Sequence, residues 1–169
     1  CNEKGWVYKG HDSVPWCPRC ETAISQHEML TEDYKEITHK SIYFELPIEG
    51  REGEYLLVWT TTPWTLPANI AVAVDAAQEY SLVEGTTGDK YWIHKDLVES
   101  VFKGEYKQII KTVLGKELVG LKYKAPFDFL DEVKKLKQEF PDKLHIVVAT
   151  DPQIMPITAT DGTGLVHTA

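Results

Sequence analysis

Residues 55–69 read YLLVWTTTPWTLPAN, and the rest of the chain is best understood from this stretch. Residues 55–59 are aliphatic or aromatic without a break, which predicts a buried β-strand. The strand runs directly into three threonines at 60–62, so it ends in hydroxyl groups. Because proline disfavours the helical conformation of the residue before it, Pro63 and Pro67 predict an extended loop that does not coil.

The three hydroxyls cannot all lie on one face of a pleated strand. Side chains alternate between faces, so the first and third threonines share one face and the second takes the other unless the strand breaks there. Pro63 supplies such a break, and the loop then presents hydroxyls together with the indoles of Trp59 and Trp64. A simpler interpretation is a threonine-rich strand that closes in a proline turn, with both tryptophans in the core.

Composition predicts one soluble globular domain. The chain has 169 residues, of which 43% are hydrophobic and 26% charged, values that favour neither disorder nor a membrane protein. No apolar run is long enough to span a bilayer and the N-terminus lacks a signal-peptide pattern, so we expect a cytoplasmic location. The net charge of −8 disfavours a protein that grips many phosphates, so an RNA partner would contact it only through a short end.

The apolar patterns predict more strands than helices. We expect an α+β fold, a mainly antiparallel, barrel-like β domain with two or so flanking helices. The helices are expected at 96–102 and 130–140, where apolar residues recur at helical spacing. The strands are expected at 41–46, 55–59, 70–74, 80–83, 90–93, 106–113, 117–123, 145–150 and 165–167.

The cysteines lie in the first part of the chain, where short strands and turns are expected over residues 1–35. Cys17 and Cys20 have the spacing of a zinc knuckle, but tetrahedral zinc needs four ligands. His11, His27 or Cys1 could complete such a site, and a reduced pair without metal is the alternative.

Several motifs together resemble one family. The run WTTTPWTLPAN at 59–69 resembles the threonine-rich peptide of the editing domain of isoleucyl-tRNA synthetases, and DGTGLVHTA at 161–169 resembles that domain's second substrate-binding strand. Residues 17–23, 41–43 and 126–128 follow in the family's order, so the resemblance spans nearly the whole chain. It implies a stalk with the Cys-x-x-Cys knuckle at 1–35 and an editing domain at 36–169.

At two places the motifs differ from those of the related valine and leucine enzymes, and these differences favour the isoleucine enzyme. The valine and leucine enzymes of this family carry an arginine and an acidic residue after the paired threonines, where Pro63, Trp64 and Thr65 stand here. The valine enzyme has a lysine where this chain has His167. The resemblance therefore implies hydrolysis of valine wrongly attached to tRNA(Ile), and possibly of valyl-adenylate, within an ATP-binding ligase of protein biosynthesis.

The resemblance also assigns the site. A water held by hydroxyls would attack the ester, since threonine is too weak a base to take a proton itself at neutral pH. The implied catalytic residues are Thr60, Thr61 and Thr62. The implied substrate-binding residues are Trp59, Trp64, Thr65, Asn69, Gly162, Thr163, Gly164 and His167.

The resemblance to the family further implies the partners and cofactors. The partners are the acceptor end of tRNA(Ile) carrying valine and the remainder of the synthetase chain, with no membrane. The editing reaction needs no cofactor, while a second cysteine pair of the full-length enzyme would complete zinc binding at Cys17 and Cys20.

In the family an aspartate beyond the histidine strand holds the substrate amino group, and this chain ends at Ala169 before it, so we expect a truncated domain that hydrolyses poorly. The alternative function is a noncatalytic zinc-knuckle module that binds RNA or links domains.

Overall fold

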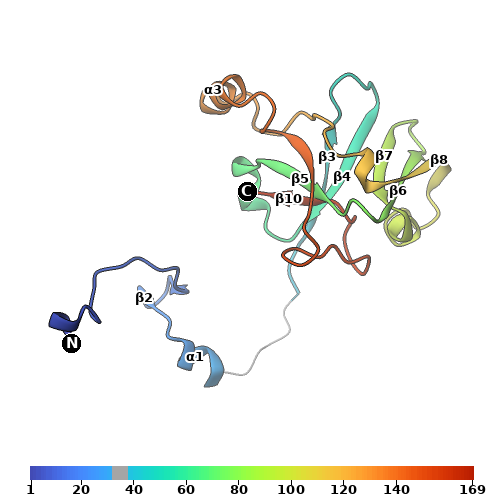
Figure 1. Cartoon of the computed structure of the whole chain (residues 1–169). Coiled ribbons are helices and arrows are strands. Elements are labelled where there is room, and N and C mark those ends of the chain that lie inside the picture. The colour runs from blue at the N-terminus through green and yellow to red at the C-terminus, as the bar shows by residue number, and fades with distance from the viewer. Residues whose placement is uncertain (32–37) are drawn as a thin grey trace. The chain divides into compact units, whose positions relative to one another are not determined.

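The computed structural model describes residues 1–31 and 38–169, and the described chain divides into two compact units (Figure 1). The first unit is Cys1–Thr38 and the second is His39–Ala169. The predicted boundary between residues 35 and 36 lies outside the described residues. No helix within the described ranges is both long and apolar enough to cross a bilayer.

The first unit carries short elements. They are the 3₁₀ helix η1 (Asn2–Lys4), the antiparallel strands β1 (Trp16–Cys17) and β2 (Thr22–Ala23), and the helix α1 (Gln26–Thr31). The helix α1 was not predicted, although its start has a local signal. The Ser25 hydroxyl and Glu28 carboxylate form a capping box: the Ser25 N–H donates to Glu28 Oε2 at 2.7 Å, and the Glu28 N–H donates to Ser25 Oγ at 3.3 Å.

The larger sheet of the second unit has five strands. Its order is β3-β4-β7-β6-β8, so β4, which carries the apolar run before the threonines, has neighbours on both sides. The strands are β3 (Ile42–Pro47), β4 (Glu54–Thr60), β6 (Glu79–Gly85), β7 (Lys90–His94) and β8 (Tyr106–Leu114). All pairings are antiparallel except that of β4 with β7, which is parallel.

A second sheet of three strands carries the C-terminal motif. In Figure 1, β10 (Val166–Thr168) lies beside β5 (Ala71–Val74), although nearly a hundred residues separate them in sequence. The other neighbour of β5 is β9 (Ile146–Ala149), which pairs with it in parallel. His167 is opposite Val72 in the antiparallel register, so the strand that follows the threonine loop holds the histidine strand in place.

The helices are short and lie between strands. They are η2 (Pro63–Ala68), η3 (Lys95–Leu97), α2 (Val98–Phe102), η4 (Gly115–Glu117) and α3 (Asp131–Glu139). The two helices expected from periodicity correspond to η3 with α2, and to α3.

The core of the second unit consists of two apolar clusters. The larger includes Leu56 and Val58 of β4, Val72 and Val74 of β5, and Leu165 before β10. The smaller gathers Leu57, Val83, Ile93, Leu97 and Val98. Because consecutive residues of β4 point to opposite faces, Leu57 packs into the second cluster while its neighbours pack into the first.

The α+β prediction of a mostly β domain with a few helices is confirmed. The strand arrangement is less regular than a barrel: within the described residues the strands form open sheets that do not close, and two of the pairings are parallel. Parallel neighbours need a crossover between them, so they depend on long-range packing and leave no local sequence signal.

Two local predictions were wrong. The loop after β4 coils into η2 and does not stay extended, because Pro63 sits at the first helical position, where its missing N–H costs nothing and its fixed φ suits the helix. The restriction on Thr62 is real, with φ −125° and ψ 63°. The strand expected over 117–123 is also absent: η4 occupies its start, and Lys122 and Tyr123 form only isolated bridges.

Candidate functional site

The threonine loop begins inside the sheet and turns on its own hydroxyls. Thr60 is the last residue of β4 and is only 7% exposed. Its Oγ1 accepts the backbone N–H of Thr62 at 3.0 Å and lies 3.3 Å from the Thr62 hydroxyl. The Thr60 hydroxyl therefore stabilises the turn, and Thr61 and Thr62 are the threonines with more exposed side chains.

A pocket of about 380 Å³ lies between the threonine loop and the histidine strand. It is lined by Trp59, Thr60, Thr61, Thr62, Thr65, Val166, His167 and Ala169. The structure thus brings two segments about a hundred residues apart in sequence to one cavity. None of the described residues that line it is an aspartate or a glutamate.

His167 has a hydrogen-bond partner at each ring nitrogen. Its Nε2 lies 2.8 Å from Thr65 Oγ1, and its Nδ1 lies 2.8 Å from Asn69 Nδ2. The Thr65 hydroxyl in turn donates to the Thr62 carbonyl at 2.8 Å. Burial lowers the pKa of His167, so the ring is neutral at physiological pH.

Asn69 and Trp64 lie outside the pocket lining. Asn69 is 6% exposed, and its amide contacts His167 from behind the pocket wall. Trp64 is 74% exposed on η2, so its indole faces solvent.

Trp59 and Val166 line both the threonine pocket and a neighbouring pocket that the glycine motif lines. This second pocket, of about 280 Å³, includes Gly162, Thr163 and Gly164. Gly162 packs directly on the Trp59 ring: a Cβ there would lie 2.7 Å from Cε3. The glycine turn is thus needed for close approach to an indole, which its φ of +76° also favours.

The hydroxyls and the histidine define what the pocket can do chemically. Both nitrogens of His167 are engaged by neighbours, and threonine is too weakly basic to deprotonate water. The groups left to contact a bound water are the hydroxyls of Thr61 and Thr62, which can orient it and donate to an oxyanion. This donor set suits hydrolysis of an activated ester by a positioned water.

The cysteine pair forms a knuckle at the β1–β2 turn. Cys17 Sγ accepts the Cys20 N–H at 3.4 Å, which lowers the pKa of Cys17, while the pKa of Cys20 is raised by its hydrogen bond to Cys17. Two thiolates supply half of a tetrahedral zinc site. Within the described ranges no third histidine, cysteine or carboxylate joins them to make a metal-binding group.

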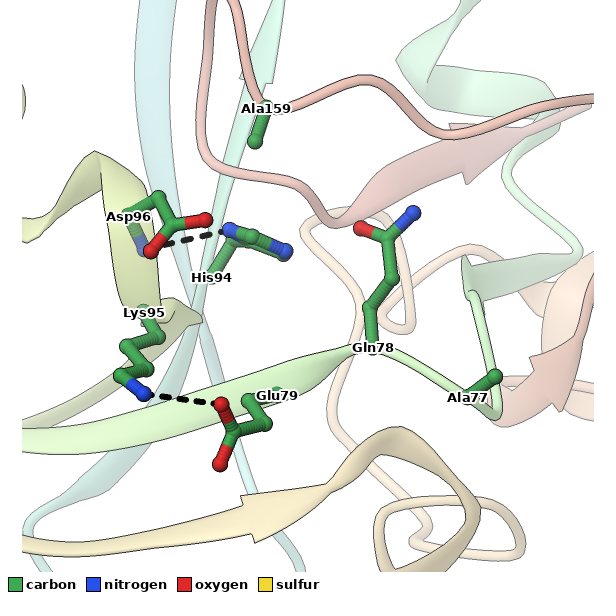
Figure 2. Close-up of a pocket in the computed structure, with 7 residues that line it drawn as sticks. All are labelled: Ala77, Gln78, Glu79, His94, Lys95, Asp96 and Ala159. Carbon is green, nitrogen blue, oxygen red and sulfur yellow. Dashed lines mark hydrogen bonds and ion pairs between the residues drawn. The ribbon is translucent and has the colours of Figure 1, made fainter.

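A further pocket of about 370 Å³ was not anticipated from the sequence (Figure 2). Figure 2 shows the Asp96 N–H bonded to His94 Nδ1, and Lys95 paired with Glu79. The Lys95 Nζ and Glu79 Oε2 atoms lie 2.8 Å apart. His94 is buried, and burial lowers its pKa. No motif surrounds these residues in the sequence, because the pocket forms only where β6, β7 and the loop at Ala159 meet.

Solved structures share this fold. The chain superposes on the crystal structure of GlLeuRS-CP1 with a TM-score of 0.56 and 16% identity, covering 76% of this chain and 54% of that one. It superposes on the P. knowlesi cytosolic leucyl-tRNA synthetase editing domain with a TM-score of 0.55 and 13% identity, covering 76% and 56%. The fold is therefore that of synthetase editing domains.

Sequence comparison identifies the family. The profile described as tRNA synthetases class I (I, L, M and V) matches residues 1–152, and the chain belongs to this family. It is 43% identical over 167 residues to the isoleucine–tRNA ligase of Clostridium novyi, covering 99% of this chain and 15% of that one. It is 45% identical over 175 residues to that of Thermococcus kodakarensis, covering 99% and 16%. The chain thus spans about a sixth of these relatives' length.

Proposed function

We propose that this chain is the editing segment of an isoleucine–tRNA ligase and hydrolyses the ester that joins valine to tRNA(Ile). The observation that carries the proposal is the pocket of about 380 Å³ that the threonine loop and His167 line together. Its similarity to isoleucine–tRNA ligases and its editing-domain fold support the same function.

In this proposal the pocket accelerates hydrolysis by positioning the ester and the attacking water. The carbonyl carbon of the ester lies near Thr61 and Thr62, whose hydroxyls orient the attacking water and donate to the oxyanion. Trp59 and His167 form stiff walls beside the acyl side chain. The attacking water releases a proton to solvent as its oxygen bonds to the carbonyl carbon, the acyl–oxygen bond breaks, and free valine leaves while the ribose oxygen takes up a proton from solvent.

A ligase that attaches isoleucine needs a second, hydrolytic site to remove valine, and the reason is energetic. A pocket that fits isoleucine rejects valine by one methylene, worth about 1–3 kcal/mol, a figure for which isoleucine against valine in this enzyme class is itself the established example. Discrimination beyond this range requires a separate site that accepts the smaller side chain and excludes the larger one by size.

The remaining assignments follow from the proposed function. The partners are the acceptor end of valyl-tRNA(Ile) and the rest of the ligase, and the location is the cytoplasm. The editing reaction uses no cofactor. Cys17 and Cys20 contribute to a zinc site that residues outside this chain complete.

Deacylation of valyl-tRNA(Ile) by a full-length ligase that carries this segment tests the proposal. We expect Thr62→Ala and His167→Ala each to lower the rate about tenfold or more, because each removes a group that lines the pocket. The matched control is Thr86→Ala, an exposed threonine in the β6–β7 turn, which is expected to leave the rate unchanged. Normal deacylation by both pocket variants, with weakened tRNA binding, would contradict editing and favour the noncatalytic RNA-binding module.

A further inference from the structure

The amide of Asn69 is held by residues that the editing motifs do not include. Tyr123, which is 0% exposed, donates its hydroxyl hydrogen to Asn69 Oδ1 at 2.6 Å. Burial raises the pKa of Tyr123, so its hydroxyl is a neutral donor at physiological pH. This bond joins residues 54 positions apart in the chain.

The surroundings determine which end of the Asn69 amide faces His167. Asn69 Nδ2 lies 3.2 Å from the Ala71 carbonyl and 3.3 Å from the Thr168 carbonyl. An oxygen in that position would face two carbonyl oxygens and would also lose the Tyr123 donor, so these interactions together favour the NH₂ group there. The Tyr123 hydroxyl reinforces this orientation from the other end of the amide.

The orientation of the amide sets the tautomer of His167. Because Asn69 Nδ2 donates, His167 Nδ1 must accept and cannot carry a proton. The ring proton is then on Nε2, which donates to Thr65 Oγ1, and the Thr65 hydroxyl donates to the Thr62 carbonyl. A directed series of hydrogen bonds thus runs from Tyr123 through Asn69, His167 and Thr65 to the catalytic loop.

The Asn69 backbone is held by the same part of the fold as Tyr123. His145 Nε2 lies 3.1 Å from the Asn69 carbonyl, and the His145 N–H donates to the Ile70 carbonyl at 2.7 Å. The Tyr123 N–H donates to the His145 carbonyl at 3.1 Å. Asn69 therefore has little freedom to shift away from Tyr123.

We propose that Tyr123 is a positioning residue of the editing pocket, which acts through Asn69 to hold His167 in the tautomer with its proton on Nε2. The inference rests on the proposed editing function for its effect on hydrolysis. It goes further in assigning a role to a residue that neither lines the pocket nor belongs to either sequence motif.

The role follows from what the loss of the hydroxyl would allow. Without its Tyr123 partner, the Asn69 oxygen is buried and unsatisfied. Only the Ala71 and Thr168 carbonyls then favour the present orientation, so the rotated amide, whose oxygen reaches another donor, becomes populated. The Nδ1–H tautomer of His167 supplies such a donor. His167 Nε2 would then accept from Thr65 Oγ1, and the Thr65 hydroxyl would no longer donate to the Thr62 carbonyl.

The test is Tyr123→Phe, which removes one oxygen and keeps the buried ring. Nitrogen-15 NMR of histidine-labelled chain reports the tautomer and the pKa of His167 directly, independently of catalysis. We expect the Nε2–H tautomer in the unmodified chain, and in the variant a mixed tautomer with a pKa shifted from its lowered value. In the full-length ligase we expect valyl-tRNA(Ile) deacylation to fall about tenfold. Tyr106→Phe is the matched control, since it removes a tyrosine hydroxyl of β8 that donates to Glu99 of α2, and neither residue lines the pocket.

The outcomes separate the inference from the proposed function. An Nδ1–H tautomer in the unmodified chain would overturn the inference even if Tyr123→Phe failed to fold. An unchanged tautomer and pKa in the folded variant would also overturn it, as would unchanged deacylation despite a changed tautomer. If Tyr123→Phe changes the tautomer but the ligase without substitutions does not deacylate valyl-tRNA(Ile), the positioning of His167 is supported and the editing function is contradicted.

Discussion

Among the three consecutive threonines, Thr60 is the one whose hydroxyl accepts a backbone N–H of the loop. By accepting the Thr62 N–H, it makes the chain turn where β4 ends and leaves Thr61 and Thr62 beside the pocket. Gly162 has a local structural role in the segment before β10. Only a residue without a Cβ lets the backbone lie against the Trp59 ring there. At the scale of single residues, the site depends on which polar groups the loop uses for its own turn and which it presents to the pocket.

Gly162→Ala tests the close approach to Trp59. Alanine in the left-handed region costs about 1–2 kcal/mol, and displacing a packed ring adds about 1–3 kcal/mol. The matched control is Gly50→Ala, because Gly50 has a φ of +75° but no atom lies within 4 Å of the position that a Cβ would take there. Urea unfolding should therefore show a larger loss for Gly162→Ala, and equal losses would mean that the contact with Trp59 contributes nothing.

At the scale of elements, strand pairing determines where the pocket residues lie. β4 carries Trp59 and Thr60, while β10 carries His167 and is held by β5. Leu165, which is buried in the larger core cluster, anchors the chain immediately before β10. The position of the histidine strand thus depends on core packing at its entry.

Leu165→Ala should weaken that anchor. Truncating a buried leucine costs about 2–5 kcal/mol through lost transfer energy and the cavity it leaves. Leu136→Ala on α3 removes the same atoms from a side chain that is 45% exposed, and should cost about 1 kcal/mol or less. The urea midpoint of each variant measures the difference, and a Leu165→Ala loss no greater than that of Leu136→Ala would contradict anchoring through the core.

At the scale of the whole molecule, burial gives three histidines a common response to pH. The pKa values of His94, His145 and His167 are all lowered, chiefly by desolvation, and at His145 this outweighs the opposing Asp128 carboxylate. Each ring binds a proton more readily in the unfolded chain than in the folded one. Their contribution to stability is therefore present above the unfolded pKa of about 6.5 and is lost as pH falls below it.

Urea unfolding between pH 7.5 and pH 5 should show this loss. We expect the midpoint to be flat above about pH 6.5 and to fall steadily below it. The carboxyl groups of Glu28 and Glu84, whose pKa values are lowered by hydrogen bonds, lose their contribution only in stronger acid. His39→Gln, at an exposed position, should reproduce the same curve, and a midpoint unchanged down to pH 5 would contradict the role of the buried rings.

The sequence by itself determined the elements whose causes are local. The unbroken apolar run specifies β4, the three- and four-residue spacing specifies α3, and the row of hydroxyls at the strand end specifies the chemistry available there. The capping box of α1 was an equally local signal that the pattern of short turns obscured.

Only the tertiary structure decided how these parts meet. The prolines were compatible with either an extended loop or η2, and the folded loop forms the 3₁₀ helix that places Thr65 beside His167. The parallel pairing of β5 with β9, and the hydrogen bond from Tyr123 to Asn69, join segments that no local pattern connects. The reason is physical: a buried polar group takes whichever partner the packed core brings within reach, and that partner depends on every element around it.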